Sequence, residues 1–148
     1  MAMTTLILYA SLALGVSFLC SILEAVVLSI PHTYIAVLEK DGDKNGILWA
    51  NLKEDDAVKP LTAILTLNTI AHTMGAAGVG SEVQSIWGEG ALTVASIILT
   101  IAVLFLSEIV PKTLGTAYWK QLAPITGKVL NFLIKFLVLL IIPIQALK

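Results

Sequence analysis

Three long apolar runs constrain this chain more than any other feature of its sequence. They cover residues 6–30, 61–80 and 91–110. A bilayer core about 30 Å thick takes about 20 apolar residues in helical form, so each run is long enough to cross it. The composition agrees, because 57% of the residues are hydrophobic and only 13% are charged, which is unlike soluble domains. The pattern predicts an all-α, multi-pass integral membrane protein.

The lysines predict how these spans are oriented. No Lys or Arg precedes the first run and no convincing small-residue cleavage site follows it, so we expect a retained span rather than a signal peptide. Four lysines lie between the first two runs, several follow the third, and residues 81–90 have none. The positive-inside rule then places the N-terminus outside and residues 31–60 in the cytoplasm, with everything after Lys112 on the cytoplasmic side or at its interface.

A weaker apolar stretch at residues 129–147 overlaps a stripe of polar residues that begins before it. Members of this stripe recur three and four residues apart, at Gln121, Pro124, Lys128, Asn131 and Lys135. Such a stripe is typical of an interfacial helix, so we expect residues 114–147 to form amphipathic or re-entrant belt helices on the cytoplasmic side. The side chains expected to enter the acyl region are Leu130, Leu133, Ile134 and Leu137. An ordinary fourth span remains the alternative, because the apolar length is about 19 residues.

The loop between the first two spans contains the sequence DGDKNG at residues 41–46. It matches the first half of a calcium-binding helix-loop-helix, with oxygens at positions one, three and five and glycine at six. Position twelve needs a bidentate carboxylate and is Leu52. We therefore expect a solvated turn between two short helices rather than a calcium site.

The three spans contain polar groups that are costly in hydrocarbon. Two are carboxylates, Glu24 in the first run and Glu108 at the end of the third. An ionisable group in a span normally faces a bundle interior or an aqueous cavity, so both are functional candidates. The polar residues at helical spacing beside them are Ser17 and Ser21 in the first run, Thr66, Asn68, Thr69, His72 and Thr73 in the second, and Thr93, Ser96, Thr100 and Ser107 in the third.

Oxygen donors dominate this polar set, which favours a hard cation and disfavours soft metals. Pro111 cannot donate a backbone hydrogen bond and clashes with the preceding turn, so the carbonyls near residue 107 lose their usual partner and can turn toward an ion. Lys112 has two interpretations. It is either the interface anchor that follows many spans, or the charge that neutralises Glu24 or Glu108 when the ion leaves.

Helix packing is the alternative explanation for the polar set, because Ser and Thr hydroxyls bond back to helix carbonyls and join helices. We accept this explanation for the three hydroxyl residues between positions 93 and 100. It is unfavourable for Asn68 and Glu108, whose desolvation costs more than a packing role normally warrants. His72 fits equally well as a member of the ligand shell or as a packed hydrogen-bonding residue.

Two further features of the spans concern packing rather than ion chemistry. The run GAAGVG at residues 75–80 lets two backbones approach closely, which predicts tight helix packing or a dimer. The single cysteine, Cys20, lies within a span. It gives no disulfide framework and no thiolate metal site.

Three motifs carry a resemblance to the CorC and CNNM family of magnesium transporters, whose membrane domain is also called DUF21 or cyclin M. The third-helix signature of the family, Gly-Glu-Ile-x-Pro-Lys, is similar to SEIVPK at residues 107–112, with serine in place of glycine. The residues that resemble the end of its first helix are Ser21, Glu24, Ala25 and Ser29. Those that resemble its second-helix pattern are Leu67, Asn68 and His72, with histidine where many members have asparagine. The resemblance implies that residues 1–148 form a single transmembrane domain.

The resemblance implies a homodimer with three spanning helices per subunit, a cytoplasm-facing cavity and a largely dehydrated Mg²⁺ between the helices, in a bacterial or archaeal plasma (inner) membrane. It implies Ser21, Asn68 and Glu108 as ligands, and Ser107 as the source of a backbone or hydroxyl oxygen. The supporting positions are Glu24, Thr66, His72, Pro111 and Lys112. Family members continue into paired nucleotide-binding CBS modules, which these residues do not contain, so we expect an excised membrane domain or a membrane-only member.

We therefore expect a transporter rather than an enzyme, one that exports magnesium by loading it from a cytoplasmic cavity and rearranging at Pro111. An alternative from another class is a non-transporting dimeric scaffold with a structural ion, which would hold cytoplasmic CBS modules together. Transport of another cation, such as Na⁺, Co²⁺ or Ca²⁺, is a third hypothesis. The expected partners are membrane lipid and a second copy of the chain. The 9 basic and 10 acidic residues give no indication of nucleic acid.

Overall fold

A computed structural model describes residues 2–137 and residue 143 and shows an all-helical protein, with no strand among these residues. Its elements are α1 (Ala2–Ser29), α2 (His32–Lys40), α3 (Lys44–Leu52), α4 (Glu54–Trp87), the 3₁₀ helix η1 (Glu89–Ala91), α5 (Leu92–Ala102), the π-helix η2 (Val103–Ile109), α6 (Val110–Ala117) and α7 (Trp119–Phe136). Residues 138–142 and 144–147 of the apolar stretch predicted at residues 129–147 lie outside the described residues. The prediction of a fourth span there is therefore not addressed by the structure.

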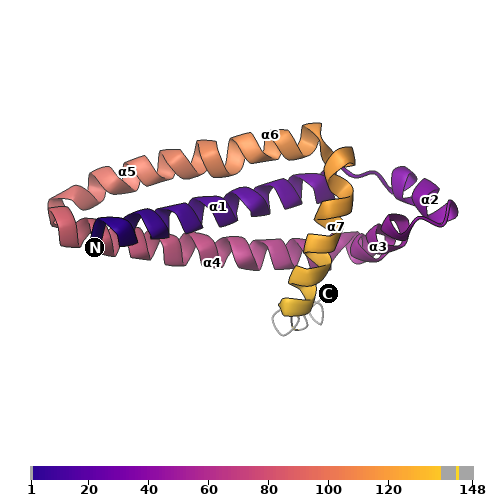
Figure 1. The fold of residues 1–148 in the computed structure, drawn as a ribbon, viewed down its shortest axis with the longest axis horizontal. Coiled ribbons are helices and arrows are strands. Elements are labelled where there is room, and N and C mark those ends of the chain that lie inside the picture. The colour runs from indigo at the N-terminus through magenta and orange to yellow at the C-terminus, as the bar shows by residue number, and fades with distance from the viewer. Residues whose placement is uncertain (1, 138–142, 144–148) are drawn as a thin grey trace. The chain divides into compact units, whose positions relative to one another are not determined.

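The chain divides into two compact units. The first comprises Met1–Ser21 and Leu67–Pro111, and the second comprises Ile22–Thr66 and the residues from Lys112 onward. In the first unit, the N-terminal part of α1 runs beside the C-terminal part of α4 and beside α5 and η2 (Figure 1). Two long helices, α1 and α4, thus contribute to both units.

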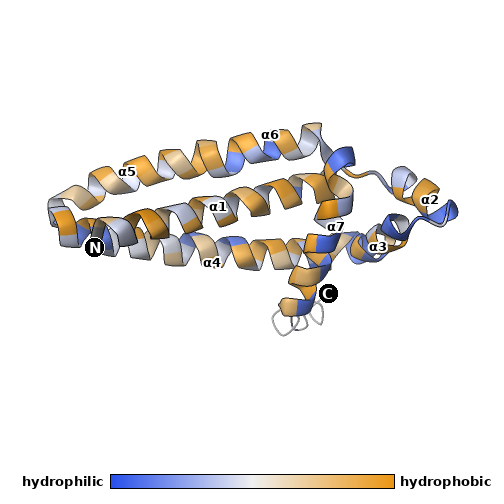
Figure 2. Cartoon of the chain, viewed as in Figure 1, coloured by the Kyte–Doolittle hydropathy of each residue, from blue (hydrophilic) through white to orange (hydrophobic). Residues whose placement is uncertain are grey.

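Two helical segments are long and apolar enough to cross a membrane, Met3–Ser29 and Glu89–Ala117. They contain the first and third predicted spans. Figure 2 shows both as predominantly hydrophobic ribbons. The second predicted span lies within α4, whose 34 residues begin with three acidic side chains. This helix is long enough to span, but it is less apolar than the other two. The chain is a membrane protein with at least two helices suited to crossing the bilayer.

Pro111 does not interrupt the third apolar segment. The helix widens into the π-helix η2 and continues as α6 through the proline. At the end of η2 the Val110 N–H donates to the Phe105 carbonyl, five residues earlier. Pro111 has no backbone N–H to donate. In the π-turn before it each N–H bonds five residues back instead of four, so the carbonyl that lacks a partner is a different one from that in an α-helix. The predicted helix break is therefore a local widening.

The two short helices predicted around the DGDKNG turn are present as α2 and α3. Asp43 is the N-cap residue of α3, and its carboxylate accepts a hydrogen bond from the Asn45 backbone N–H at 2.8 Å. A Cβ atom on Gly46 would lie 2.4 Å from the Glu39 nitrogen, so glycine is needed where α2 and α3 cross. A capping role for Asp43 explains this acidic turn without calcium.

The start of α4 contains a left-handed segment. Asp55, Asp56 and Ala57 have φ angles of 53°, 58° and 62°. A non-glycine residue in this conformation is strained, and alanine more so than aspartate, whose side chain tolerates it. Ala57 is only 3% exposed, so its surroundings hold it in place. The right-handed part of α4 therefore begins after Ala57.

Helix α7 packs on the second unit through a face centred on Leu130, which is fully buried. The Trp49 indole N–H donates to the Ala123 carbonyl at 2.9 Å, which fixes α7 against α3. Leu133 and Ile134 pack with Leu137 against Ala63 of α4. The expectation that Leu130 and Leu137 enter the acyl region is therefore wrong, because both side chains are buried in the protein, whereas Leu133 and Ile134 are partly buried.

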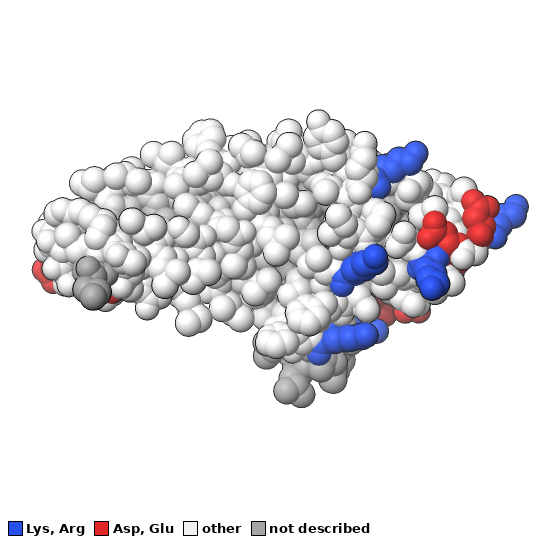
Figure 3. Space-filling model, in the orientation of Figure 1, with Lys and Arg blue, Asp and Glu red and all other residues white. Residues whose placement is uncertain are grey.

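The charged side chains gather on particular elements. Figure 3 shows them around α2 and α3 and over α7, while the visible surface of the long apolar helices is almost free of charge. The four lysines between the first and second apolar runs belong to the second unit, and so do the lysines that follow the third run. The side of the membrane that these lysines face stays a prediction.

Candidate functional site

Two of the four predicted ligand residues, Ser21 and Ser107, lie in direct contact in the first unit. The Ser21 hydroxyl donates to the Ser107 main-chain carbonyl, and both residues are buried. The Ser107 hydroxyl donates in turn to the Leu14 carbonyl at 3.0 Å. Since an α-helical Ser107 carbonyl would bond to the N–H of residue 111, a proline, the Ser21 hydroxyl takes the place of the missing donor. The Ser107 carbonyl, expected to lose its helical partner and turn toward an ion, thus accepts a hydrogen bond from α1.

Helix α4 is held close to α1 by small residues. A Cβ atom on Gly75 would lie 2.3 Å from the Ala13 Cβ, and one on Gly78 would lie 2.5 Å from the Tyr9 ring. The small-residue run therefore brings α1 and α4 of the same chain together, which is the packing role proposed for it. About one turn further along each helix from the Ala13–Gly75 contact, Ser17 Oγ and His72 Nε2 are 2.7 Å apart. This pair joins the same two helices by a hydrogen bond.

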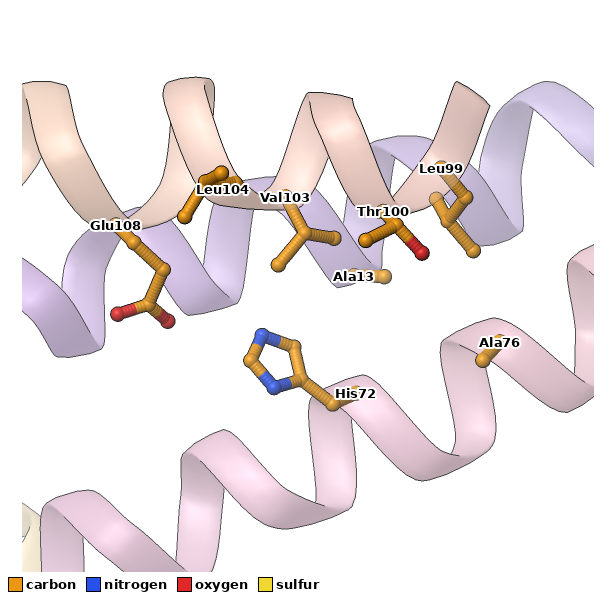
Figure 4. A pocket seen from close by; sticks show the side chains of 8 residues that line it. All are labelled: Ala13, His72, Ala76, Leu99, Thr100, Val103, Leu104 and Glu108. Carbon is orange, nitrogen blue, oxygen red and sulfur yellow. The ribbon is translucent and has the colours of Figure 1, made fainter. Parts of the chain in front are cut away.

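A cavity of about 340 Å³ lies between these helices and the third apolar segment. Its lining residues are Ala13 from α1, His72 and Ala76 from α4, Leu99 and Thr100 from α5, and Val103, Leu104 and Glu108 from η2. The Glu108 carboxylate and the His72 ring extend into the same space from opposite helices (Figure 4). Glu108 is half-buried and faces the helix bundle, as predicted for a carboxylate in a span.

Asn68 carries a buried oxygen without a hydrogen-bond partner among the described residues. Its Oδ1 atom is inaccessible to solvent, and no described group donates to it. Leaving a buried acceptor unpaired costs about 1 to 3 kcal/mol. Asn68 is one turn of α4 from His72, although it does not line the cavity with Glu108. An oxygen held in this state is suited to a ligand with positive charge.

The supporting residues are distributed over both units. Glu24 and Lys112 belong to the second unit, where Lys112 Nζ lies 3.8 Å from Glu24 Oε2. Both side chains are partly exposed, so this pair contributes little stability. Thr66 donates its hydroxyl to the Thr62 carbonyl at 2.8 Å, a bond within α4. Of the supporting set, His72 and Pro111 belong to the first unit with the four predicted ligands.

The donors of the candidate site are mainly neutral oxygens, and Glu108 supplies the one carboxylate among the four predicted ligands. The described part of the chain has no group of three or more His, Cys, Asp and Glu side chains close enough to share a metal ion. Hydroxyl, amide, carbonyl and carboxylate oxygens are the ligands of hard cations such as Mg²⁺. The His72 ring is the exception, since imidazole nitrogen also suits transition metals.

Two residues near these donors were not among the predicted site residues. Ser17 is fully buried and bonds to His72, and the Leu14 carbonyl accepts from Ser107. The spacing of four between Ser17 and Ser21, which places both hydroxyls on one face of α1, put Ser17 in the polar set of the first run but not among the predicted ligands. No side-chain signal identifies Leu14, since only its backbone oxygen takes part. Thr100, which we interpreted as a packing residue, donates its hydroxyl to the Ser96 carbonyl at 2.7 Å within α5 and also lines the cavity.

The amino-acid sequence matches a known family over most of its length. Residues 8–148 match the cyclin M transmembrane N-terminal domain. This match includes every residue discussed above except those before position 8. It agrees with the resemblance seen in the three helix motifs.

Two curated relatives are similar to this chain. UPF0053 protein sll1254 of Synechocystis sp. is 27% identical over 117 residues, which are 79% of this chain and 34% of that protein. The chloroplastic DUF21 domain-containing protein At1g55930 of Arabidopsis thaliana is 26% identical over 118 residues, 80% of this chain and 18% of that protein. The chain therefore spans about a third of the first relative and less than a fifth of the second.

Proposed function

Because the chain belongs to the cyclin M transmembrane N-terminal domain family, we propose that it transports magnesium ions across a membrane, in the direction of export. The observation that carries this proposal is the buried Asn68 Oδ1 atom without a hydrogen-bond partner, in the same unit as the Glu108 carboxylate and the Ser21–Ser107 pair. A desolvated amide oxygen in a membrane domain that also holds a carboxylate is favourable when a cation is bound to it.

The proposed ligands of the transported ion are Ser21, Asn68, Ser107 and Glu108. They come from three helical segments, α1, α4 and η2. Mg²⁺ prefers octahedral oxygen coordination and gives up water reluctantly, so several ligands from separate helices are needed to replace its hydration shell. The Ser21 hydroxyl oxygen and the Ser107 carbonyl each keep a lone pair beyond their mutual hydrogen bond. His72, Pro111, Glu24, Thr66 and Lys112 have supporting roles in this proposal.

The proposed topology has three spans, with α4 as the second. The N-terminus lies outside, α2 and α3 form the cytoplasmic loop, and α7 lies as a belt helix at the cytoplasmic interface. The lysines support this arrangement, and so does α7, whose buried face packs on protein while other faces remain exposed. We further propose a homodimer in a bacterial or archaeal plasma membrane.

Magnesium flux into or out of proteoliposomes tests this function. Wild-type protein should move Mg²⁺, whereas Glu108→Gln and Asn68→Leu should reduce flux at least tenfold while the protein stays folded and keeps its oligomeric state. Thr93→Val is the matched control, because Thr93 is an exposed polar residue of the same apolar segment as Glu108 and is not a proposed ligand. Its flux should equal that of the wild type.

The same measurement separates the alternatives. A protein that binds Mg²⁺ through Glu108 but never moves it would be the dimeric scaffold, and the transport proposal would be wrong. Competition by Na⁺, Co²⁺ or Ca²⁺ in the same liposomes identifies the transported cation. Flux of another ion with no flux of Mg²⁺ would also overturn the proposal.

A further inference from the structure

The last part of the sequence has an unusual distribution of charge. All ten acidic residues lie at or before Glu108. The basic residues after it are Lys112, Lys120, Lys128, Lys135 and Lys148. The segment from residue 109 to the end therefore carries five positive side chains and no negative one. In Figure 3, lysine side chains project over α7.

Helix α7 has three different faces along its described length. The face that packs on the second unit is made of Ala123, Thr126, Gly127 and Leu130. A second face is apolar and exposed, with Ile125 and Phe132 each 65% exposed and Phe136 75% exposed. Residues four and seven positions apart share a helix face, and the rings of Phe132 and Phe136 stack at 6.3 Å. This exposed apolar stripe has no protein partner within the described chain.

The third face of α7 carries the lysines. Lys128 and Lys135 are exposed and seven residues apart, so they point the same way. Each lies three residues after a member of the apolar stripe, Ile125 or Phe132, and residues three apart are neighbours on a helix surface. Positive charges thus run along one edge of the apolar stripe. Lys120 differs, because its ammonium lies 5.6 Å from the Tyr34 ring centre.

We propose that the stripe formed by Ile125, Phe132 and Phe136, together with Lys128 and Lys135, binds a membrane leaflet that contains anionic phospholipid. Apolar side chains enter the acyl boundary while neighbouring ammonium groups contact phosphate and anionic headgroups. Charge complementarity selects this occupant, because a second copy of α7 would bring like charges together. The proposal rests on the interfacial placement of α7 given above, but it does not depend on which ion is transported or on transport itself.

Site-specific quenching by brominated lipid tests the proposal. A fluorescent label is attached to Ile125→Cys in full-length protein with Cys20→Ala, in phosphatidylcholine vesicles that contain a minor fraction of brominated phosphatidylglycerol. We expect the local fraction of phosphatidylglycerol at this label to exceed its fraction in the whole vesicle. Each neighbouring lysine should contribute a factor of about five or more. The control label at Val94→Cys, on an exposed apolar residue of α5 without nearby lysines, should report the bulk fraction.

The double variant Lys128→Gln/Lys135→Gln should lower the enrichment at position 125 to that of the Val94→Cys control. Both lysines are exposed, so this variant is expected to fold. Equal enrichment at both labels, or enrichment unchanged in the double variant, would overturn the proposal. So would a disulfide between copies through Ile125→Cys with no lipid quenching, because a second chain would then cover the stripe. Quenching only by bromines at the acyl chain ends would show that α7 crosses the bilayer and would overturn the interfacial placement itself.

Discussion

The hydroxyl of Ser21 donates a hydrogen bond to the main-chain carbonyl of Ser107, four residues before Pro111. In an α-helix this carbonyl would accept from the N–H of residue 111, which proline lacks. A side chain on α1 thus meets the requirement that a proline creates in the third apolar segment. The two helices are joined through two of the proposed ion ligands, Ser21 and Ser107.

This relationship predicts an energetic coupling between Ser21 and Pro111. Ser21→Ala removes the donor and leaves a buried carbonyl unpaired, which should lower the free energy of unfolding by about 1 to 3 kcal/mol. Pro111→Ala restores a backbone N–H that can reach the same carbonyl. Ser21→Ala should therefore cost much less in the Pro111→Ala background. Reversible unfolding of the four proteins in detergent measures this double-mutant cycle.

Thr100→Ala is the control for that cycle. It removes a hydroxyl that donates to the Ser96 carbonyl within one helix, and that carbonyl keeps the Thr100 backbone N–H as a helical partner. Its effect should be small and should not depend on residue 111. An equal cost of Ser21→Ala with proline or alanine at position 111 would show that the hydroxyl does not replace the missing donor.

Close packing of α4 on α1 gives a second prediction. Gly75→Ala would place a Cβ atom 2.3 Å from the Ala13 Cβ, and overpacking of this kind costs about 1 to 3 kcal/mol. Gly80→Ala should have little effect, because its nearest neighbour would be the Leu92 side chain at 3.9 Å. Thermal unfolding of the two variants provides the comparison. Rescue of Gly75→Ala by Ala13→Gly would assign the defect to this contact, and a lack of rescue would exclude it.

Lys53 gives a prediction about alkaline pH. Its ammonium donates to the Val27 carbonyl at 2.9 Å, near the C-terminal end of α1. Desolvation by burial lowers the pKa of Lys53 below its ordinary value of 10.5. Between the lowered pKa and 10.5, the unfolded chain binds more protons at this residue than the folded chain does. The contribution of Lys53 to stability therefore rises with pH in that interval.

The measurement is the free energy of unfolding of wild type and Lys53→Met as pH increases toward 10.5. The difference should move in favour of the wild type as pH rises, because the variant lacks the titrating group. Lys40→Met, at the exposed end of α2, is the control for removal of a lysine charge. A pH-independent difference for Lys53→Met would contradict the assignment.

The sequence predicted helices best where a single local property, such as apolar length or a turn motif, determines where the helix lies. The length of the apolar runs identified α1 and the third apolar segment, and the turn residues around Asp43 identified α2 and α3. The π-helix before Pro111 was not predicted, because a proline removes a helical hydrogen bond without specifying the pattern that replaces it. The buried face of α7 was assigned wrongly because it depends on packing against other helices. Periodicity separated Lys128 from Leu130, but only tertiary packing shows that Leu130 faces protein while Phe132 is exposed.

The ligand set of the candidate site stays a prediction, although the structure brings some of its members together. The cost of burying a carboxylate identified Glu108, and the structure places it in a cavity with His72. The hydrogen bond between Ser21 and Ser107 joins two further members of the predicted set. The part that Ser17 plays was missed, since a serine in a span is ordinarily a packing residue. Its contact with His72 exists only because the small residues of α4 bring that helix close to α1.

The His72 ring in the cavity with Glu108 leads to a prediction about ion selectivity that rests on the proposed transport. Imidazole nitrogen favours Co²⁺ over Mg²⁺, whereas an amide oxygen does not. His72→Asn should therefore weaken inhibition of Mg²⁺ flux by Co²⁺ on the order of tenfold, while Mg²⁺ flux is retained. Ser17→Ala should act in the same direction, because a partner that orients a ligating imidazole contributes about 10- to 100-fold to metal affinity. Competition curves in proteoliposomes measure both effects. Unchanged Co²⁺ inhibition in His72→Asn would show that His72 only joins α4 to α1 through Ser17.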